Sequence, residues 1–379
     1  MFEQTKRFCD TLPQLGAPFF DVAVYVDGKC VLRHSGGYTD PEKTLPVTGQ
    51  ERYNIYSCSK AITCTAAMQL WEKGLFSLED PLAKYMPEFA EMTVKTEDGI
   101  RPAEKQILIR HLFEMTAGFS YALRSPQLVK AREETDGCPT REVMRYLALE
   151  PLLFEPGDRW NYSLCHDVLA ALVEVLSGQR FEDYVHDHIF VPLGMDRSTF
   201  VLPEAERESL VTQYRFNEEK RIAEPCGKQC VYMFGSRYAS GGAGCVSTVD
   251  DYMKFLEGLR TGKLLKPETV KLMHTDRLTE HQKRTYTAAV NYGYGLGQRC
   301  PKEGGKFVNF GWGGAAGAYH TIDPECNMSV YMGMHLLNSP VQGIRGMVYR
   351  FARAELFGTE SIEALWQEVE KVSGYKLTY

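Results

Sequence analysis

The sequence contains no run of about 18 or more apolar residues, the minimum for a helix that crosses a membrane. It also lacks runs of Lys and Arg, and its net charge is −6 with an isoelectric point near 5.9. Such a chain offers neither an apolar span for a bilayer nor a basic surface for nucleic acid or an anionic membrane. We therefore expect neither a membrane nor a nucleic acid as partner.

Signals for export and for disulfide bonding are missing as well. No apolar segment of signal-peptide length follows Met1, because Asp10 and Pro13 interrupt it. The eleven cysteines are odd in number, which favours reduced thiols over a disulfide framework. These features predict a cytoplasmic protein.

Patterns that bind metal are incomplete. Cys226 and Cys230 resemble half of a zinc site, but no second pair follows at zinc-like spacing. His186 and His188 are two residues apart and would not share a helix face. We predict no metal site.

Two motifs of common enzyme classes are also absent. The chain has no Gly-x-Ser-x-Gly elbow, which disfavours an α/β-hydrolase mechanism. The glycine-rich segment 311–317 lacks the Gly-Lys-Ser/Thr ending of a phosphate-binding loop. Without a functional role, this segment would be a flexible turn.

The composition that remains is typical of a globular protein. Of the 379 residues, 44% are hydrophobic and 24% are charged. A chain of this length is too long for one simple core, so two lobes are expected. The sequence carries no pattern that specifies an oligomeric state.

Hydrophobic periodicity changes twice along the chain. Asp27-Gly28 lies between two β-rich runs, which predicts a hairpin over 19–34. Helical spacing dominates from Ser57 to about 264, most clearly over 164–177 and 249–259. The final part predicts strands and then helices, at 307–310, 318–322, 328–334, 341–356 and 361–372.

This order predicts an α+β fold with an antiparallel sheet built from both chain ends and flanked by helices. The chain would form a single domain with a sheet lobe of about 1–56 and 265–379. A mainly helical lobe of about 57–264 would be inserted between these two parts.

A serine and a lysine three residues apart stand at the start of the helical region. Ser57 and Lys60 would share one face of a helix, so the lysine nitrogen could reach the serine oxygen. A serine hydroxyl is a poor nucleophile until a neighbouring base takes its proton, and a buried lysine can help to do so. The alternative is an N-cap serine beside a solvated lysine. The same pattern at Ser373 and Lys376 contains a glycine and lies near the chain end, so we discount it.

Two further motifs follow in order. The first is 156–163, Pro-Gly-Asp-Arg-Trp-Asn-Tyr-Ser, which precedes an amphipathic stretch. The second is 311–317, Gly-Trp-Gly-Gly-Ala-Ala-Gly, which precedes a strand. Together with Ser57-Cys58-Ser59-Lys60, they make the chain resemble the serine β-lactamase and penicillin-binding-protein superfamily from about residue 15 to 355. The branch it resembles most is the class C β-lactamase-like, or family VIII, carboxylesterases.

The resemblance implies roles for individual residues. Tyr162 would share proton transfer with Lys60, and the backbone amides of Ser57 and Ala315 would form an oxyanion hole. Without the resemblance, Tyr162 would be a buried aromatic residue with a satisfied hydroxyl. No metal or organic cofactor is implied.

The third motif departs from the β-lactamases, which have Lys-Thr-Gly where this chain has Trp312-Gly313-Gly314. A flat apolar ring replaces the lysine, as in esterase-like relatives, and the two glycines would let the strand backbone approach a substrate. Leu164 stands where many β-lactamases have an asparagine, and leucine cannot donate its hydrogen bond. Trp312 and Tyr121 are candidate walls of the substrate pocket, or aromatic residues of a lobe interface.

We therefore expect a serine hydrolase that cleaves small-molecule esters, or amides, through an acyl-enzyme on Ser57. The alternatives are a β-lactamase or D-aminopeptidase, an acyltransferase of the same fold, and a non-catalytic ligand-binding module. Retention of Ser57, Lys60 and Tyr162 argues against the last.

Overall fold

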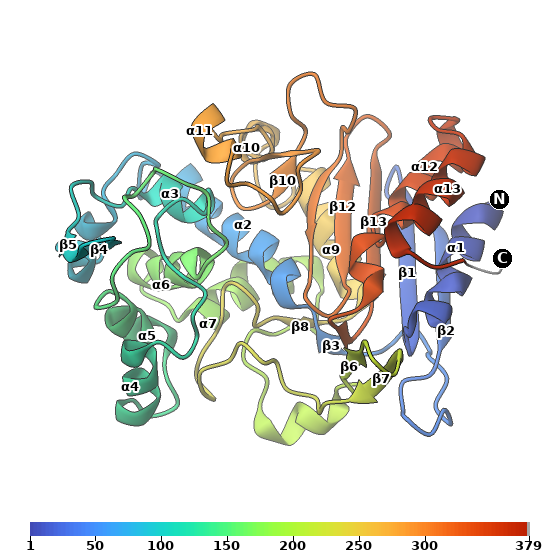
Figure 1. Cartoon of the computed structure of the whole chain (residues 1–379), viewed down its shortest axis with the longest axis horizontal. Coiled ribbons are helices and arrows are strands. Elements are labelled where there is room, and N and C mark those ends of the chain that lie inside the picture. Colours follow the sequence, from blue (N-terminus) through green and yellow to red (C-terminus); the bar gives the residue numbers. More distant parts are fainter. Residues whose placement is uncertain (377–379) are drawn as a thin grey trace.

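A seven-stranded sheet joins the two ends of the chain in the computed structural model, which describes residues 1–376 (Figure 1). Its strand order is β2-β1-β13-β12-β11-β10-β9, and all neighbouring pairs are antiparallel. The strands are β1 Phe19–Val26, β2 Lys29–Gly37, β9 Gly293–Tyr294, β10 Arg299–Cys300, β11 Phe310–Gly313, β12 Tyr319–Asp323 and β13 Met328–Gly333. The predicted α+β architecture, with one antiparallel sheet from both chain ends, is confirmed.

The predicted hairpin at Asp27-Gly28 joins β1 and β2. Both turn residues have positive φ, 50° and 79°, as a two-residue hairpin turn requires. β1 then pairs with β13 from Asp21, opposite Gly333, to Val26, opposite Met328. The first strand of the chain is therefore held by one of the last.

Side chains of β1 and β13 alternate between the two faces of the sheet. Val22, Val24, Val330 and Met332 share a core with α1 Glu3–Thr11, α12 Met347–Phe357 and α13 Ile362–Ser373. Tyr331 faces the opposite side, where its ring stacks on Tyr252 of α9 Val249–Arg260 with 4.3 Å between ring centroids. Helices thus cover both faces of the sheet.

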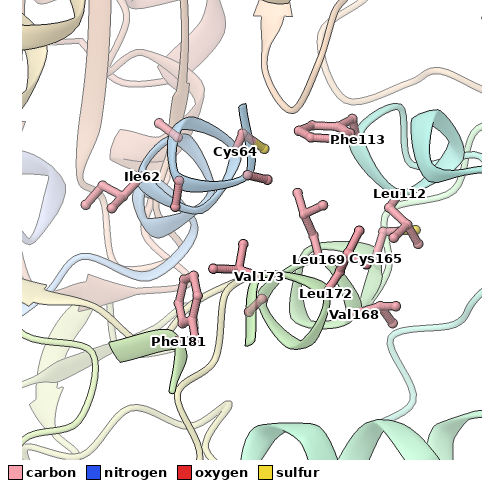
Figure 2. Packing of buried hydrophobic residues seen from close by; sticks show 14 of the residues in the cluster. Ile62, Cys64, Leu112, Phe113, Cys165, Val168, Leu169, Leu172, Val173 and Phe181 are labelled. Carbon is pink, nitrogen blue, oxygen red and sulfur yellow. The ribbon is translucent and has the colours of Figure 1, made fainter. Parts of the chain in front are cut away.

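The second part of the molecule is mainly helical and is organised around α2 Ser59–Glu72 (Figure 1). α2 packs against α6 Cys165–Ser177, whose Leu169 and Val173 lie toward it, while Ile62 points to the opposite side of α2 (Figure 2). The remaining helices are α3 Ile109–Phe113, α4 Pro126–Glu134, α5 Thr140–Leu147, α7 Phe181–Val185, α8 Val191–Leu193, α10 Pro267–Met273 and α11 Glu280–Lys283. Because α2 is buried on almost every side, its first residues are held in a fixed position.

Three small sheets complete the fold. β3 Tyr53–Asn54 pairs with β8 Val246–Ser247, and β4 Thr93–Thr96 pairs with β5 Gly99–Pro102. The third contains β6 Tyr214–Asn217, β7 Ile222–Pro225 and β14 Leu336–Leu337. Over residues 1–376, no helix combines the length and the apolarity needed to cross a bilayer.

Some element boundaries differ from the sequence prediction. The strand predicted at 307–310 is β11, three residues later, because its register is set by pairing with β12, from Phe310 opposite Ile322 to Gly313 opposite Tyr319. The helix predicted over 341–356 is divided into a 3-10 turn, Pro340–Gly343, and α12. Gly343 ends the 3-10 turn and Gly346 stands directly before α12, as expected for a poor helix former.

Candidate active site

Ser57 lies in a short 3-10 turn, Tyr56–Cys58, between β3 and the first residue of α2. Tyr56 has a φ of 50°, a left-handed conformation that costs energy in a residue other than glycine. Its hydroxyl donates to Gln213, and the Cys58 carbonyl accepts a hydrogen bond of 2.8 Å from Tyr252. The surrounding core therefore holds the turn that presents the Ser57 side chain.

The structure brings together the three side chains that the sequence singled out. Ser57 Oγ lies 2.6 Å from the Tyr162 hydroxyl and 3.2 Å from Lys60 Nζ. Lys60 is completely buried and also donates a hydrogen bond of 2.6 Å to the Gly242 carbonyl. Its Nζ is 4.6 Å from the centre of the Tyr162 ring, close enough for a cation–π interaction.

Tyr162 is fixed between two other aromatic rings. Tyr121 stacks on one side with 5.5 Å between centroids, and Trp312 on the other with 5.9 Å. The preceding residue, Asn161, donates from its side chain to the Phe119 carbonyl at 2.8 Å. Trp312 and Tyr121 thus lie beside Tyr162, where walls of a substrate site were predicted.

The turn from β11 to β12 carries Gly314 and Ala315. A Cβ on Gly314 would lie 2.4 Å from the Ile55 carbonyl oxygen, so the turn packs directly against the segment that leads into Ser57. Only glycine allows this approach. Ala315 is therefore held close to the Ser57 turn, which is the arrangement that a shared oxyanion hole would need.

Two side chains that sequence reasoning missed hold this turn. Gln342 Nε2 donates to the Ala315 carbonyl at 2.6 Å, and Arg345 Nη1 donates to the Gly314 carbonyl at 2.6 Å. The Arg345 guanidinium fills the space that a Cβ on Gly313 would occupy, 2.2 Å away. Burial lowers the pKa of Arg345, and no carboxylate within residues 1–376 pairs with it. Nothing in the local sequence marks either residue, because both act through a turn far away in the chain.

Leu164, at the N-cap of α6, is almost fully buried. Its side chain is buried in the core that α6 forms with α2. In the described part of the chain, no group of three or more His, Cys, Asp or Glu side chains is arranged to hold a metal ion.

Comparisons with known proteins define the class. The sequence model of the beta-lactamase family matches residues 10–349, and the chain belongs to this family. An uncharacterized protein of Mycobacterium tuberculosis is 30% identical over 77% of this chain and 79% of its own length. Esterase EstB of Burkholderia gladioli is 28% identical over 84% of this chain and 85% of its own.

Solved structures agree with this assignment. EstCE1, described as a hydrolase with promiscuous acyltransferase activity, superposes with a TM-score of 0.75 at 26% identity, covering 92% of this chain and 98% of its own. A simvastatin synthase from Aspergillus terreus superposes with a TM-score of 0.75 at 22% identity, covering 96% of this chain and 97% of its own, and it supports the fold alone.

Proposed function

We propose that the protein is a serine hydrolase that cleaves small-molecule esters through an acyl-enzyme on Ser57. The observation that carries this proposal is the contact of Ser57 Oγ with both the Tyr162 hydroxyl, at 2.6 Å, and Lys60 Nζ, at 3.2 Å. A hydroxyl nucleophile with two proton-transferring groups in hydrogen-bonding reach is the arrangement that acyl transfer requires.

The first half of the reaction forms the acyl-enzyme. Ser57 loses its proton to the Tyr162 and Lys60 pair while Oγ attacks the ester carbonyl carbon. The amides of Ser57 and Ala315 stabilise the oxyanion, and such a donor contributes about 3 kcal/mol in comparable sites. The alcohol then leaves with a proton from the same pair.

The second half releases the acid. Water gives its proton to the Tyr162 and Lys60 pair and attacks the acyl carbonyl, which frees Ser57 Oγ to regain a proton. Because the same groups act as base and then as acid, one arrangement serves both halves.

The walls of the site favour an ester over a β-lactam. Trp312 presents a half-buried ring, stacked on Tyr162, where a lysine would attract a substrate carboxylate. Leu164 is packed in the core and offers no hydrogen bond to an acylamide. The aromatic surface formed by Tyr121, Tyr162 and Trp312 suits an apolar acyl or alcohol group.

A substrate panel tests the proposal. p-Nitrophenyl acetate, butyrate and octanoate, nitrocefin and a D-amino acid amide are offered to wild type and to Ser57→Ala. We expect ester turnover that Ser57→Ala abolishes, and nitrocefin turnover at least about 100-fold lower than ester turnover. Equal ester turnover by the two proteins would contradict the proposal.

Acyl transfer is the second candidate function. It is favoured by relatives named as acyltransferases, among them the monacolin J acid methylbutanoyltransferase of Aspergillus terreus, which is 28% identical over 64% of this chain and 62% of its own length. Product analysis with p-nitrophenyl butyrate and added alcohol would show a new ester if an alcohol competes with water for the acyl-enzyme.

A further inference from the structure

A buried carboxylate, that of Asp167, lies beside Gly242, the residue whose carbonyl accepts a hydrogen bond from Lys60. Asp167 is in the first turn of α6 and is completely buried. Its Oδ1 accepts hydrogen bonds from the hydroxyls of Tyr238, at 2.8 Å, and Ser240, at 2.6 Å. Among the described residues, its Oδ2 makes no hydrogen bond of good geometry, although the backbone amide of Gly242 interacts with the carboxyl. A buried oxygen of this kind is rare and calls for a physical reason.

The direction of Oδ2 supplies that reason. A Cβ on Gly242 would lie 2.6 Å from Asp167 Oδ2, 3.3 Å from Lys60 Nζ and 3.5 Å from the Tyr121 hydroxyl. The carboxylate and the ammonium therefore face the same small space, and only a glycine leaves that space open. The Gly242 carbonyl, in turn, accepts the hydrogen bond from Lys60 Nζ.

Asp167 also holds the segment that contains Gly242. Tyr238 and Ser240 both donate to it, and the Ser240 hydroxyl accepts a hydrogen bond of 3.1 Å from the Ala243 amide. The carboxylate thus holds Tyr238 and Ser240 directly and Ala243 through the Ser240 hydroxyl, and the Gly242 carbonyl of this segment accepts the hydrogen bond from Lys60.

Burial keeps several other titratable groups near this pair neutral. Burial lowers the pKa of His166 to about 3 and raises the pKa of three thiols, to about 12 for Cys58 and Cys230 and about 11 for Cys165. Burial also raises the pKa of three more groups above their ordinary values: Cys64, Tyr121 and Tyr238. Asp167 is therefore the anion that faces Lys60 within residues 1–376.

Opposing effects act on the carboxyl itself. Burial raises the pKa of Asp167 above its ordinary value, while the hydrogen bond from Ser240, the charge of Lys60, and the hydrogen bonds from Tyr238 and the Gly242 amide oppose that rise. The lysine charge and the two hydroxyls thus favour the carboxylate form.

We propose that Asp167 is a positioning residue for Lys60: its negative charge balances the lysine ammonium in the space beside Gly242, and its hydrogen bonds hold the segment that aims this ammonium at Ser57. This inference rests on the proposed function of Ser57, Lys60 and Tyr162. With Lys60 held as an ammonium, Tyr162 is the group that accepts the Ser57 proton, and Lys60 stabilises the negative charge that results.

The test uses Asp167→Asn, which keeps an acceptor for both hydroxyls but removes the charge. With p-nitrophenyl butyrate we expect kcat to fall about tenfold or more, with KM changed less than about threefold, because Asp167 does not touch the substrate. The alkaline limb of the pH profile of kcat should move about one unit lower, since an ammonium without its counter-charge loses its proton more readily. An alkaline limb at the wild-type position would overturn the inference.

Two matched variants separate charge from packing. Ser240→Ala removes one hydrogen bond to Asp167 but keeps the carboxylate, so the alkaline limb should stay in place. Asp323→Asn neutralises another completely buried carboxylate, bonded to Tyr349 and Arg353 on the opposite side of the sheet. It should lower the unfolding temperature without moving the limb. A shift in either control as large as that of Asp167→Asn would overturn the inference.

A double-mutant cycle keeps the proposal testable if Asp167→Asn folds poorly. Lys60→Met combined with Asp167→Asn removes both charges, so the double variant should unfold at a higher temperature than Asp167→Asn alone. A double variant that is no more stable would overturn the charge pairing. Failure of the proposed function would look different: wild type would turn over the ester no faster than Ser57→Ala.

Discussion

At the scale of single residues, the site depends on three side chains that converge from two distant segments. Ser57 and Lys60 come from one helix start, and Tyr162 comes from the loop before α6. The lysine is buried, contacts the serine at 3.2 Å and lies over the tyrosine ring. Each group has a distinct chemical task in the proposed mechanism, so their separate removal is informative.

Lys60→Ala and Tyr162→Phe should each reduce ester turnover by about two orders of magnitude or more, because removal of the serine proton needs the two groups together. Steady-state kinetics with p-nitrophenyl butyrate, together with circular dichroism to verify folding, measures this. Tyr286→Phe is the matched control: it removes a buried hydroxyl from the same aromatic cluster, where Tyr286 packs on Trp160. Near-wild-type turnover in either test variant would remove that residue from the mechanism.

At the scale of elements, the β11–β12 turn and the segment before Ser57 form one packed unit. Gly314 approaches Ile55 so closely that no side chain fits, and Gln342 and Arg345 hold the turn from behind. The distance between the two proposed oxyanion donors is therefore set by backbone packing between the sheet and the start of α2.

Gly314→Ala should separate these two elements, because its Cβ would meet the Ile55 carbonyl oxygen at 2.4 Å. We expect kcat to fall about tenfold or more, with a lower unfolding temperature. Gly343→Ala is the control, since its Cβ would meet only Val372, at 3.4 Å. Unchanged kcat in Gly314→Ala would show that the position of the turn does not limit catalysis.

Local patterns predicted the elements and part of the site. The Asp27-Gly28 turn and the spacing over 164–177 depend on neighbours in sequence, and so does the reach of Lys60 to Ser57. Tyr162 was found through a motif rather than by periodicity.

What the sequence could not reveal depends on tertiary contacts. Gln342, Arg345 and Asp167 act on segments far away in the chain, and no local pattern distinguishes them from ordinary helix residues. Helix α1 was missed for a similar reason: it is short, and Phe8 finds its partner, the Phe351 ring, at the other end of the chain.

At the scale of the whole molecule, the large core contains several buried, neutral histidines. Burial lowers the pKa of His111, His166, His274 and His335 to about 3, and it lowers the pKa of His320 as well. In the unfolded chain each would titrate at its ordinary value of about 6.5. Below that pH the unfolded state binds more protons, so these residues contribute stability that is lost as the pH falls.

The free energy of unfolding should therefore fall between pH 6 and 5, and His335→Gln should make that fall shallower by about 1 kcal/mol per pH unit. Glutamine keeps an acceptor for Asn54, which donates to His335 at 3.1 Å. Urea unfolding at a series of pH values measures the slope. Parallel curves for wild type and His335→Gln would contradict the prediction.

The central claim, that Ser57 is the nucleophile, is tested most directly by covalent labelling. Wild type and Ser57→Ala are treated with a fluorophosphonate, and the adduct is located by intact mass followed by peptide mapping. We predict one adduct per wild-type chain, on the peptide that contains Ser57, and none on Ser57→Ala. An adduct on another residue, or equal labelling of both proteins, would contradict the account.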